Sequence, residues 1–411
     1  MFIKTRSFKP GKKYGNGSFV RQNRQGYNPN RFRRSRYGSQ RSEFGRDISV
    51  FVKKAVPVLD SSDTVMEEKT FSDFEISNPL KTNITTKGYT QPTPIQQQAI
   101  EPILEGRDLI GLANTGTGKT AAFLIPIIDQ IFKDRQKKAL IIVPTRELAV
   151  QINEELRDFS EGMRIYSALI IGGTNTQRQI YNLRRNPHFV IGTPGRLKDL
   201  IEQRALRLDD FSIFVLDEVD MMVDIGFIDD VKYFISLLPS KRQSLFFSAT
   251  ISHKIEGILR NFVNDPVTVS VKVADTAQNV EQDIIKVISR EKKIDQLHDV
   301  LIGDGVYKAL VFGRTKHSVD NLHKELIFRG FKTGAIHGNK SQGARRRVLD
   351  SFKRNEIQVL LATDVASRGL DIPNVTHVIN YEMPDSYDDY IHRIGRTGRA
   401  DKKGIALTFV D

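Results

Sequence analysis

From Phe71 onward, short runs of almost entirely apolar, often β-branched residues alternate with longer stretches of mixed polarity. This alternation is typical of βαβ units, in which helices cover both faces of a parallel sheet and the strands are apolar throughout. The first series of expected strands is Leu109–Leu112, Ala139–Val143, Ala168–Ile171, Phe189–Ile191, Ser212–Leu216 and Ser244–Phe247. The second series is Ile284–Ile288, Ala309–Phe312, Thr333–Ile336, Gln358–Leu361, His377–Ile379 and Ile405–Phe409.

Two segments separate these series of strands. Asn264-Asp265-Pro266 is a turn signal, and Ala274–Asn279 is mostly polar. We therefore expect an α/β protein with two tandem parallel-sheet domains, at residues 70–274 and 275–411, after an N-terminal tail and linker at 1–69. In open parallel sheets, ligands bind beyond the carboxyl ends of the strands, so functional side chains are expected there.

Composition excludes several classes of site. The 411 residues include no cysteine, which rules out disulfides, thiolate metal sites and cysteine nucleophiles and suits a reducing, cytoplasmic environment. No run of about 18 apolar residues is present, so we expect no membrane span and no membrane partner. The net charge of +13 is uneven, because residues 1–50 contain thirteen Lys and Arg but only two acidic residues.

The basic tail is rich in Gly, Asn, Gln, Ser and Arg, with interspersed Phe and Tyr, and it lacks apolar periodicity. Such a segment buries too little apolar surface to offset the entropy cost of ordering, so we expect it to be disordered. Arginines interleaved with aromatic residues suit single-stranded nucleic acid, through phosphate attraction and base stacking. Two alternatives remain open. The tail could be a solvated charge run that only aids solubility, or a transit peptide, although it has no amphipathic apolar face.

The run Ala113–Thr120 follows an expected strand and precedes a helical stretch. This strand–loop–helix context is what a phosphate-binding loop requires. Gly116 and Gly118 allow backbone amides to approach phosphate oxygens at the start of a helix. Lys119 offers a positive charge, and the Thr120 hydroxyl is a candidate ligand for Mg²⁺.

Two adjacent acids, Asp217 and Glu218, follow the expected strand Ser212–Leu216. Carboxylates at the end of a buried strand are costly unless a cation or another partner compensates them. A Mg²⁺ site at Asp217, with Glu218 holding the attacking water, provides such a partner. Taken alone, the acids could equally cap a helix over Asp220–Phe227; beside a phosphate loop, the metal site is the better interpretation.

Arg393, Arg396 and Arg399 recur every three residues in the run HRIGRTGR, among glycines that allow close approach. Guanidinium groups match the geometry of phosphates. Because these residues lie in the second expected domain, we interpret them as arginine fingers that reach the nucleotide across two domains. The alternative is a basic RNA-binding patch without a catalytic role.

Together these motifs resemble those of the DEAD-box ATP-dependent RNA helicases of superfamily 2, in particular the short bacterial RhlE-type members, over residues 71–411. The segment Gly88–Gln96 is similar to the adenine-reading Q motif of that family. The resemblance implies that Gln96 hydrogen-bonds the adenine edge and that Phe71 stacks on its face. It also implies two RecA-like domains, ATP as substrate, Mg²⁺ as cofactor, single-stranded and duplex RNA as partner, and a monomeric protein.

The resemblance assigns roles to many further residues. The implied ATP contacts are Phe71, Gln96, Ala113, Asn114, Thr115, Gly116, Thr117, Gly118, Lys119, Thr120, Gly369 and Asp371, with Mg²⁺ on Thr120 and Asp217. The implied catalytic residues are Lys119, Asp217, Glu218, His392, Arg396 and Arg399. The implied RNA contacts are Pro144, Thr145, Arg146, Gly172, Gly173, Thr193, Pro194, Gly195, Arg196, Arg314, Thr315, Gln342, Arg345 and Thr363. Ser248 and Thr250 resemble the element that couples hydrolysis to strand separation.

The expected function is ATP-dependent unwinding or remodelling of RNA, without sequence preference. Glycine-containing turns before helices present amides to phosphates and position a strand without reading its bases. The preference for RNA rests on the resemblance alone, because it requires contacts to 2′-hydroxyls. The alternatives are a non-unwinding RNA-binding protein, either an ATP-gated clamp or a tail-driven chaperone, and an enzyme that unwinds DNA.

Four positions depart from the family pattern. They are Ala113 for Gly and Asn114 for Gln, Thr117 for Ser, and Val219 for the Ala of the family motif. None of these changes removes a catalytic group. The family continues beyond the position of Asp411 with a helix and a tail, so either the second domain lacks a covering element or the chain is incomplete.

Overall fold

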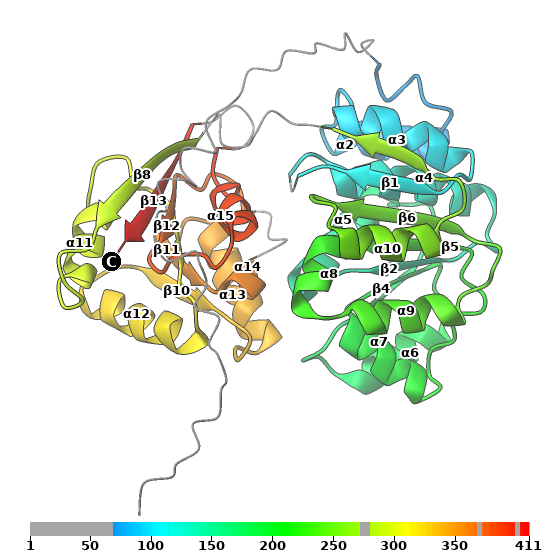
Figure 1. Cartoon of the computed structure of the whole chain (residues 1–411). Helices are drawn as coiled ribbons and strands as arrows, with labels where there is room; N and C mark the ends of the chain where they lie inside the picture. The colour runs from blue at the N-terminus through cyan, green and yellow to red at the C-terminus, as the bar shows by residue number, and fades with distance from the viewer. Residues whose placement is uncertain (1–68, 115, 272–279, 368–371, 399–402, 411) are drawn as a thin grey trace, which may run out of the picture. The chain divides into compact units, whose positions relative to one another are not determined.

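The computed structural model of the chain describes residues 69–114, 116–271, 280–367, 372–398 and 403–410 (Figure 1). The N-terminal tail and the expected boundary after residue 274 lie outside these ranges. Four of the expected site residues are also outside them: Thr115, Gly369, Asp371 and Arg399. None of the helices in the described ranges has the length and apolar character needed to cross a bilayer.

The first sheet has seven strands in the order β3-β4-β2-β5-β6-β1-β7, and all neighbours are parallel. Its strands are β1 (Leu109–Leu112), β2 (Ala139–Ile142), β3 (Ser167–Ile170), β4 (Phe189–Gly192), β5 (Ile213–Asp217), β6 (Gln243–Ser248) and β7 (Val267–Ser270). The six expected strands are present, each shifted by at most one residue at either end. Strand β7 is an addition to the expected set. It is an edge strand in which only Val269 is buried, so its sequence carries a weaker apolar signal.

Helices pack on both faces of this sheet. They are α2 (Asn78–Thr86), α3 (Pro94–Leu104), α4 (Lys119–Lys133), α5 (Arg146–Phe159), α6 (Thr176–Arg184), α7 (Pro194–Glu202), α8 (Val219–Ile225), α9 (Ile228–Leu237) and α10 (His253–Phe262). One apolar core joins the sheet to α2–α5, and a second joins its other face to α6–α10. Within β2, Leu140 and Ile142 belong to the second core while Ile141 belongs to the first. Burial on both faces explains why these strands are continuously apolar.

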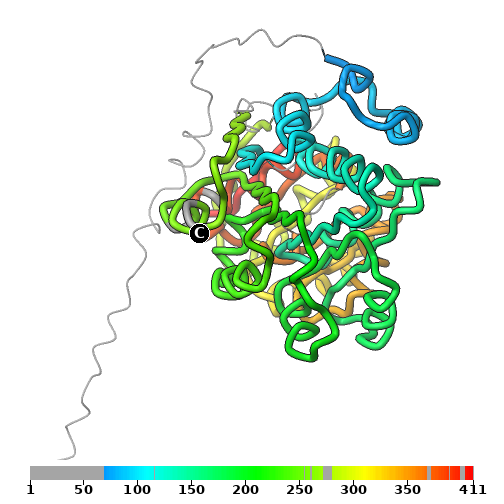
Figure 2. Tube along the Cα trace, turned by 90° about the vertical axis from the view of Figure 1, so that its right-hand side faces the viewer, coloured from blue at the N-terminus to red at the C-terminus, as the bar shows by residue number. Residues whose placement is uncertain are grey.

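The second sheet has six parallel strands in the order β10-β11-β9-β12-β13-β8. They are β8 (Val280–Lys286), β9 (Ala309–Phe312), β10 (Thr333–Ile336), β11 (Val359–Ala362), β12 (His377–Asn380) and β13 (Gly404–Val410). Helices α11 (Lys293–Leu301) and α12 (Lys316–Phe328) cover one face. Helices α13 (Gln342–Lys353), α14 (Asp364–Ser367) and α15 (Tyr387–Ile394) cover the other. Figure 2 shows the course of the chain from the first described residues, in blue, to the last, in red.

One expected strand is displaced in the second sheet. The apolar run Ile284–Ile288 predicts a strand there, but β8 begins at Val280 and ends at Lys286. It is an edge strand paired only with β13, and its burial alternates, so the polar residues between Val280 and Ile284 are part of it. Ile288 follows the strand and is 70% exposed. An apolar run alone therefore misplaces a half-exposed edge strand.

Candidate nucleotide and RNA sites

The strand order divides the expected site residues of the first sheet into two groups. Strands β5, β6 and β1 are neighbours, and their carboxyl ends lead to Asp217, to Ser248 and to the phosphate loop. Strands β3, β4 and β2 are also neighbours, and the expected RNA residues at Gly172, Thr193 and Pro144 follow them. One half of a single sheet edge therefore carries nucleotide chemistry, and the other half carries the expected RNA contacts.

The phosphate loop joins β1 to α4 as its sequence predicts. Gly116 and Gly118 have φ values of 88° and 92°, a left-handed conformation that glycine adopts without strain. Gly118 is the N-cap of α4, so Lys119 is its first residue. The Lys119 side chain is only 6% exposed, and its Nζ has no hydrogen-bond partner among the described residues. A buried ammonium without a partner at a helix N-terminus is suited to receive an anion.

Gln96 connects the expected adenine-binding segment to this loop. Its Oε1 accepts a hydrogen bond from the Thr93 amide at 2.9 Å, and its Nε2 donates to the Gly118 carbonyl at 3.1 Å. Each end of the amide keeps capacity for one further hydrogen bond. Phe71 is 5% exposed, and its ring centroid lies 6.1 Å from those of both Phe74 and Tyr89.

Strand β5 carries the acids to the sheet edge. All five of its residues are buried, and Asp217, its last, is 2% exposed. Glu218 follows in the left-handed conformation, with φ 57°, and its amide donates to Asp217 Oδ1 at 3.0 Å. Burial raises the pKa of Asp217 to about 7, an effect that the positive charge of Lys119 opposes. The carboxylates of Glu218 and Asp220 add to the increase. The site therefore has an excess of buried negative charge that a cation would relieve.

Asp220 is a functional candidate to which the sequence analysis assigned no role. Its Oδ2 accepts hydrogen bonds from the amides of Ala249 and Thr250, both at 3.1 Å, and from the Thr250 hydroxyl at 3.3 Å. Its own amide donates to Ser248 Oγ at 3.3 Å. Asp220 thus ties the start of α8 to the segment after β6. The available sequence signal was its place as the fourth residue of the run DEVD.

The expected RNA residues of the first domain lie at the starts of helices α5 and α7 and in the turn after β3. Thr145 is the N-cap of α5 and accepts a hydrogen bond from the Leu148 amide at 3.3 Å. Pro194 begins α7. The Arg146 guanidinium lies against the turn after β3, where a Cβ added to Gly172 or Gly173 would meet it at 2.8 and 2.6 Å. Gly173 has φ 75°, a left-handed conformation that favours glycine, whereas the atoms near Gly172 belong to the end of the flexible Arg146 side chain.

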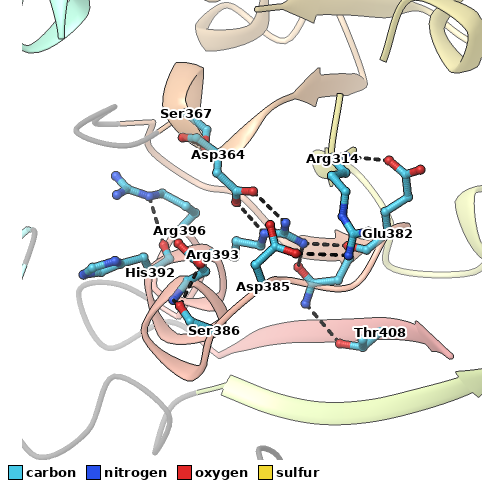
Figure 3. Close-up of polar contacts among 12 residues, drawn as sticks. Arg314, Asp364, Ser367, Glu382, Asp385, Ser386, His392, Arg393, Arg396 and Thr408 are labelled. Atoms are coloured by element: carbon cyan, nitrogen blue, oxygen red, sulfur yellow. Dashed lines mark hydrogen bonds and ion pairs between the residues drawn. The ribbon is translucent and has the colours of Figure 1, made fainter. Parts of the chain in front are cut away.

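In the second sheet, Arg393 is engaged within its own domain (Figure 3). Its Nε and Nη2 donate to the two carboxylate oxygens of Asp364 at 2.5 and 2.7 Å. Its Nη1 donates to the Glu382 carbonyl at 2.7 Å and to Asn380 Oδ1 at 3.2 Å, and the guanidinium lies over the Phe312 ring. The interpretation of Arg393 as an arginine finger is therefore wrong, since its donors are used to hold α15 against α14 and β12.

Arg396 and His392 lie on another side of this cluster. The Nε of Arg396 donates to the main-chain carbonyl of His392 at 3.3 Å, and the Arg396 side chain points away from Asp364 (Figure 3). Both residues line a small cavity together with Lys119, Glu218 and Asp220. Catalytic candidates from both domains thus border one space.

Two expected RNA residues of α13 are engaged with an acid of the first domain. Gln342 Nε2 and Arg345 Nη2 donate to the two carboxylate oxygens of Glu147, at 3.0 and 2.6 Å, and all three side chains are buried. Arg314 is exposed and pairs with Asp385 at 3.1 Å. The remaining expected residues of this domain follow β9 and β11: Thr315, which caps α12, and Thr363, whose carbonyl accepts from the Ala366 and Ser367 amides.

Comparison with known proteins identifies the family. Residues 93–258 match the DEAD/DEAH box helicase model, and residues 292–401 match the helicase conserved C-terminal domain. The chain is 46% identical over 342 residues to the ATP-dependent RNA helicase CshA of Listeria monocytogenes, covering 83% of this chain and 66% of the relative. It is 45% identical over 343 residues to the DEAD-box ATP-dependent RNA helicase CshA of Bacillus subtilis, covering 83% of this chain and 69% of the relative. The chain thus spans about two thirds of the length of these curated relatives.

A solved structure agrees with this assignment. S. cerevisiae Dbp5 bound to RNA and ADP BeF3 is similar with a TM-score of 0.75 and 30% identity, covering 83% of this chain and 89% of that chain. The two parallel sheets described above are the RecA-like pair expected from the sequence. The relatives carry the name CshA, whereas the sequence resemblance pointed to RhlE-type members, a difference within the bacterial DEAD-box group. Both domain models match in order, and the Bacillus subtilis relative is 45% identical with 69% of its length covered, so the chain belongs to the DEAD-box family of ATP-dependent RNA helicases.

Proposed function

We propose that this protein is an RNA-stimulated ATPase that binds single-stranded RNA without sequence preference and unwinds or remodels RNA duplexes. The observation that carries the proposal is the buried, unpartnered Lys119 ammonium beside the carboxylates of Asp217 and Glu218, all at neighbouring strand ends. Phosphoryl transfer requires such an arrangement, because catalysis there consists mostly of positioning and charge stabilisation.

The nucleotide is held by the first domain in this proposal. The phosphate loop, Ala113–Thr120, cradles the phosphates with its backbone amides, and Lys119 neutralises their charge. Gln96 pairs with the adenine edge through the hydrogen-bonding capacity it retains, while Phe71 contacts the base. Gly369 and Asp371, outside the described residues, complete the site at the ribose.

Thr120 and Asp217 would hold Mg²⁺, and their chemistry fits that ion. Hard oxygen ligands suit Mg²⁺, which keeps few protein ligands when it also binds phosphates. Burial raises the pKa of Asp217 to about 7, so a nearby cation is needed to keep this carboxyl ionised at neutral pH. When bound, the ion supplies positive charge to the phosphate oxygens.

The chain's own residues then orient and stabilise the reaction. Glu218, at the left-handed turn after β5, holds the attacking water. Arg396 and His392 border the same cavity and stabilise the developing charge, together with Arg399. Asp220 hydrogen-bonds to Ser248 and Thr250, as described above. We propose Ser248 and Thr250 as the coupling element, because these bonds would transmit a change at the nucleotide site to the segment after β6.

RNA lies along the other half of the sheet edge in this proposal. The contacts are the residues after β2, β3 and β4 in the first domain, and Arg314, Thr315, Gln342, Arg345 and Thr363 in the second. Helix N-termini and backbone amides contact phosphates, which carry no sequence information. Because Gln342 and Arg345 already bond to Glu147, these two residues would position the domains around RNA as well as contact it.

We also propose the domain limits 70–274 and 275–411, a disordered RNA-attracting tail over residues 1–69, and a monomer acting in the cytoplasm, where ATP and RNA are both present. The tail carries most of the net positive charge and none of the catalytic motifs, so it would act as a tether for RNA.

The test is steady-state ATP hydrolysis by the full chain with RNA, with DNA and without nucleic acid. We expect RNA to stimulate turnover strongly, because RNA and ATP together assemble the two-domain site. Binding of RNA with little or no turnover would instead support an ATP-gated clamp. Equal stimulation by DNA would contradict the RNA preference.

A further inference from the structure

Basic and aromatic side chains line the amino edge of the first sheet, opposite the edge that carries the proposed nucleotide site. Lys138, Tyr166 and His188 immediately precede β2, β3 and β4. Because these parallel strands are neighbours in the order β3-β4-β2, the three side chains stand in a row along this edge. None of them belongs to the site described above.

Tyr166 and His188 form a rigid aromatic platform. Their rings stack with centroids 6.1 Å apart and planes 24° from parallel. The Tyr166 amide donates to His188 Nδ1 at 3.2 Å, and the His188 amide donates to the Tyr166 carbonyl at 2.9 Å. Tyr166 is nevertheless 57% exposed, so much of its side chain remains accessible for stacking.

Four arginines lie close in the sequence to Lys138, Tyr166 and His188. Arg135, Arg164, Arg184 and Arg185 are all exposed, and none has an ion pair with a described residue. The Arg135 guanidinium donates to the Met163 and Arg164 carbonyls at 2.9 and 3.3 Å, which places it beside the turn into β3. Burial, followed by the charges of Arg135 and Lys138, lowers the pKa of His188. The local field is therefore positive.

A pocket of about 430 Å³ adjoins the row. Lys138 and Asn186 line it, and Lys138 Nζ hydrogen-bonds to Asn186 Oδ1 at 2.6 Å. Its apolar wall includes Leu183 and Phe211. The volume lies within the range of about 300–1,000 Å³ typical of small-molecule sites, so the pocket can admit a nucleobase. Asp209 and Asp210 also line the pocket, where they pair with Arg207 and Lys138, so the unpaired positive charge near the row comes mainly from the four arginines.

We propose that this amino edge is a second RNA-binding surface, which holds single-stranded RNA outside the catalytic cleft. A base stacks on Tyr166, a neighbouring base enters the pocket, and the phosphates contact Arg164, Arg184 and Arg185. Stacking on exposed aromatic rings combined with guanidinium contacts is how proteins bind single strands without sequence preference. An acidic protein would match the charge but would leave the exposed aromatic platform unused.

The proposal rests on RNA being the ligand of the protein, but not on unwinding. A strand that leaves the cleft could be retained on this surface while the two domains open. The surface would then add affinity for long RNA only, because a short oligonucleotide bound at the carboxyl edge of the sheet does not reach the amino edge.

The test compares two triple variants of the full chain. The first is Arg164→Gln, Arg184→Gln and Arg185→Gln. The matched control, Arg107→Gln, Lys232→Gln and Lys241→Gln, removes three other exposed cations of the same domain. Affinity for a long unstructured RNA and for a short oligonucleotide is measured across a salt series by fluorescence anisotropy. If the three arginines contact phosphates, the log–log salt slope for the long RNA flattens by about 2 in the first variant and stays unchanged in the control.

Tyr166 gives a second, independent readout. Tyr166→Ser should weaken binding of the long RNA roughly tenfold, while Tyr166→Phe, which keeps the stacking ring, should not. RNA containing 4-thiouridine should form a cross-link at Tyr166. Hydrolysis stimulated by the short oligonucleotide should be unchanged in every variant, and this assay separately tests the proposed function.

Coincident salt slopes for the two triple variants would overturn the proposal. So would an equal loss of affinity for short and long RNA, because that would place the effect in the cleft. Unchanged RNA affinity together with binding of an acidic polypeptide to this edge would identify a protein-binding surface instead.

Discussion

Replacing Arg393 with lysine should destabilise the second domain, whereas the same change at Arg396 should mainly impair hydrolysis. Arg393 is 2% exposed and donates two charged hydrogen bonds to Asp364, one to the Glu382 carbonyl and one to Asn380. A lysine keeps the charge but cannot reproduce the planar fork. Hydrogen bonds to charged groups contribute about 1.5–3 kcal/mol each, so losing two of the four should cost about 3 kcal/mol or more.

This loss is measurable as a shift in thermal unfolding. For a domain of this size, 1 kcal/mol corresponds to roughly 4 °C in Tm, so Arg393→Lys should lower the transition of the second domain by about 12 °C or more. Scanning calorimetry gives the shift, and amide hydrogen exchange should localise it to α14, β12 and α15. Arg396→Lys serves as the comparison, because the Arg396 side chain borders the cavity that Lys119 and Glu218 also line.

The two variants should differ in which property they lose, stability for Arg393→Lys and hydrolysis for Arg396→Lys. Arg396→Lys removes no bidentate pair with Asp364, so it should cost less stability than Arg393→Lys. It should nevertheless lower RNA-stimulated hydrolysis at least tenfold, because arginine fingers contribute far more than that to turnover. Arg393→Lys should retain most of its hydrolysis at temperatures where the domain is folded. If Arg393→Lys unfolds at the parent temperature but loses hydrolysis, then Arg393 contacts phosphate and the structural role assigned to it is wrong.

Further predictions concern the nucleotide site and the tail. Lys119→Ala and Glu218→Gln should nearly abolish hydrolysis, and Glu218→Gln should still bind ATP in equilibrium dialysis, because a water-orienting group acts on the transition state more than on binding; turnover within a few-fold of the parent would contradict the role of Glu218. ATP should be hydrolysed in preference to GTP, since guanine reverses the donor and acceptor pattern that an amide at Gln96 can pair, and equal turnover of both nucleotides would exclude this reading. Deleting residues 1–50 should spare hydrolysis but flatten the salt slope of RNA binding by roughly 3.5, if about five tail cations contact phosphates of a single strand. Coincident binding curves for the full and truncated chains would leave the tail without a role in RNA attraction.

Sequence alone predicted the fold because both sheets consist largely of strands buried on two faces. Such strands are continuously apolar, and their carboxyl ends collect functional groups. The phosphate loop could be located for the same reason, since its glycines must adopt φ values near 90° and its lysine must begin a helix. These requirements depend only on neighbouring residues, so they can be recognised in a short stretch of sequence.

Two edge strands, β7 and β8, were predicted less well than the others, because only part of their surface is buried. Strand β7 gave too weak an apolar signal, and β8 includes polar residues that face solvent. Both strands are defined by hydrogen bonds to a neighbour distant in sequence, β1 in one case and β13 in the other. The pattern of apolar and polar residues within a strand does not indicate which distant strand it pairs with.

The roles of individual polar residues were decided by tertiary structure. Arg393 and Arg396 stand three residues apart in one motif and look equivalent in sequence, yet Asp364 and β12 occupy the first while the second borders the cavity. Asp220 likewise acquires its partners from a segment about thirty residues away. The sequence determined which chemical groups this protein brings to its sheet edges. Only the packing of distant segments decided which of those groups form internal hydrogen bonds and which border the cavity. The reason is that the partners of a side chain are its neighbours in space, which the local sequence does not specify.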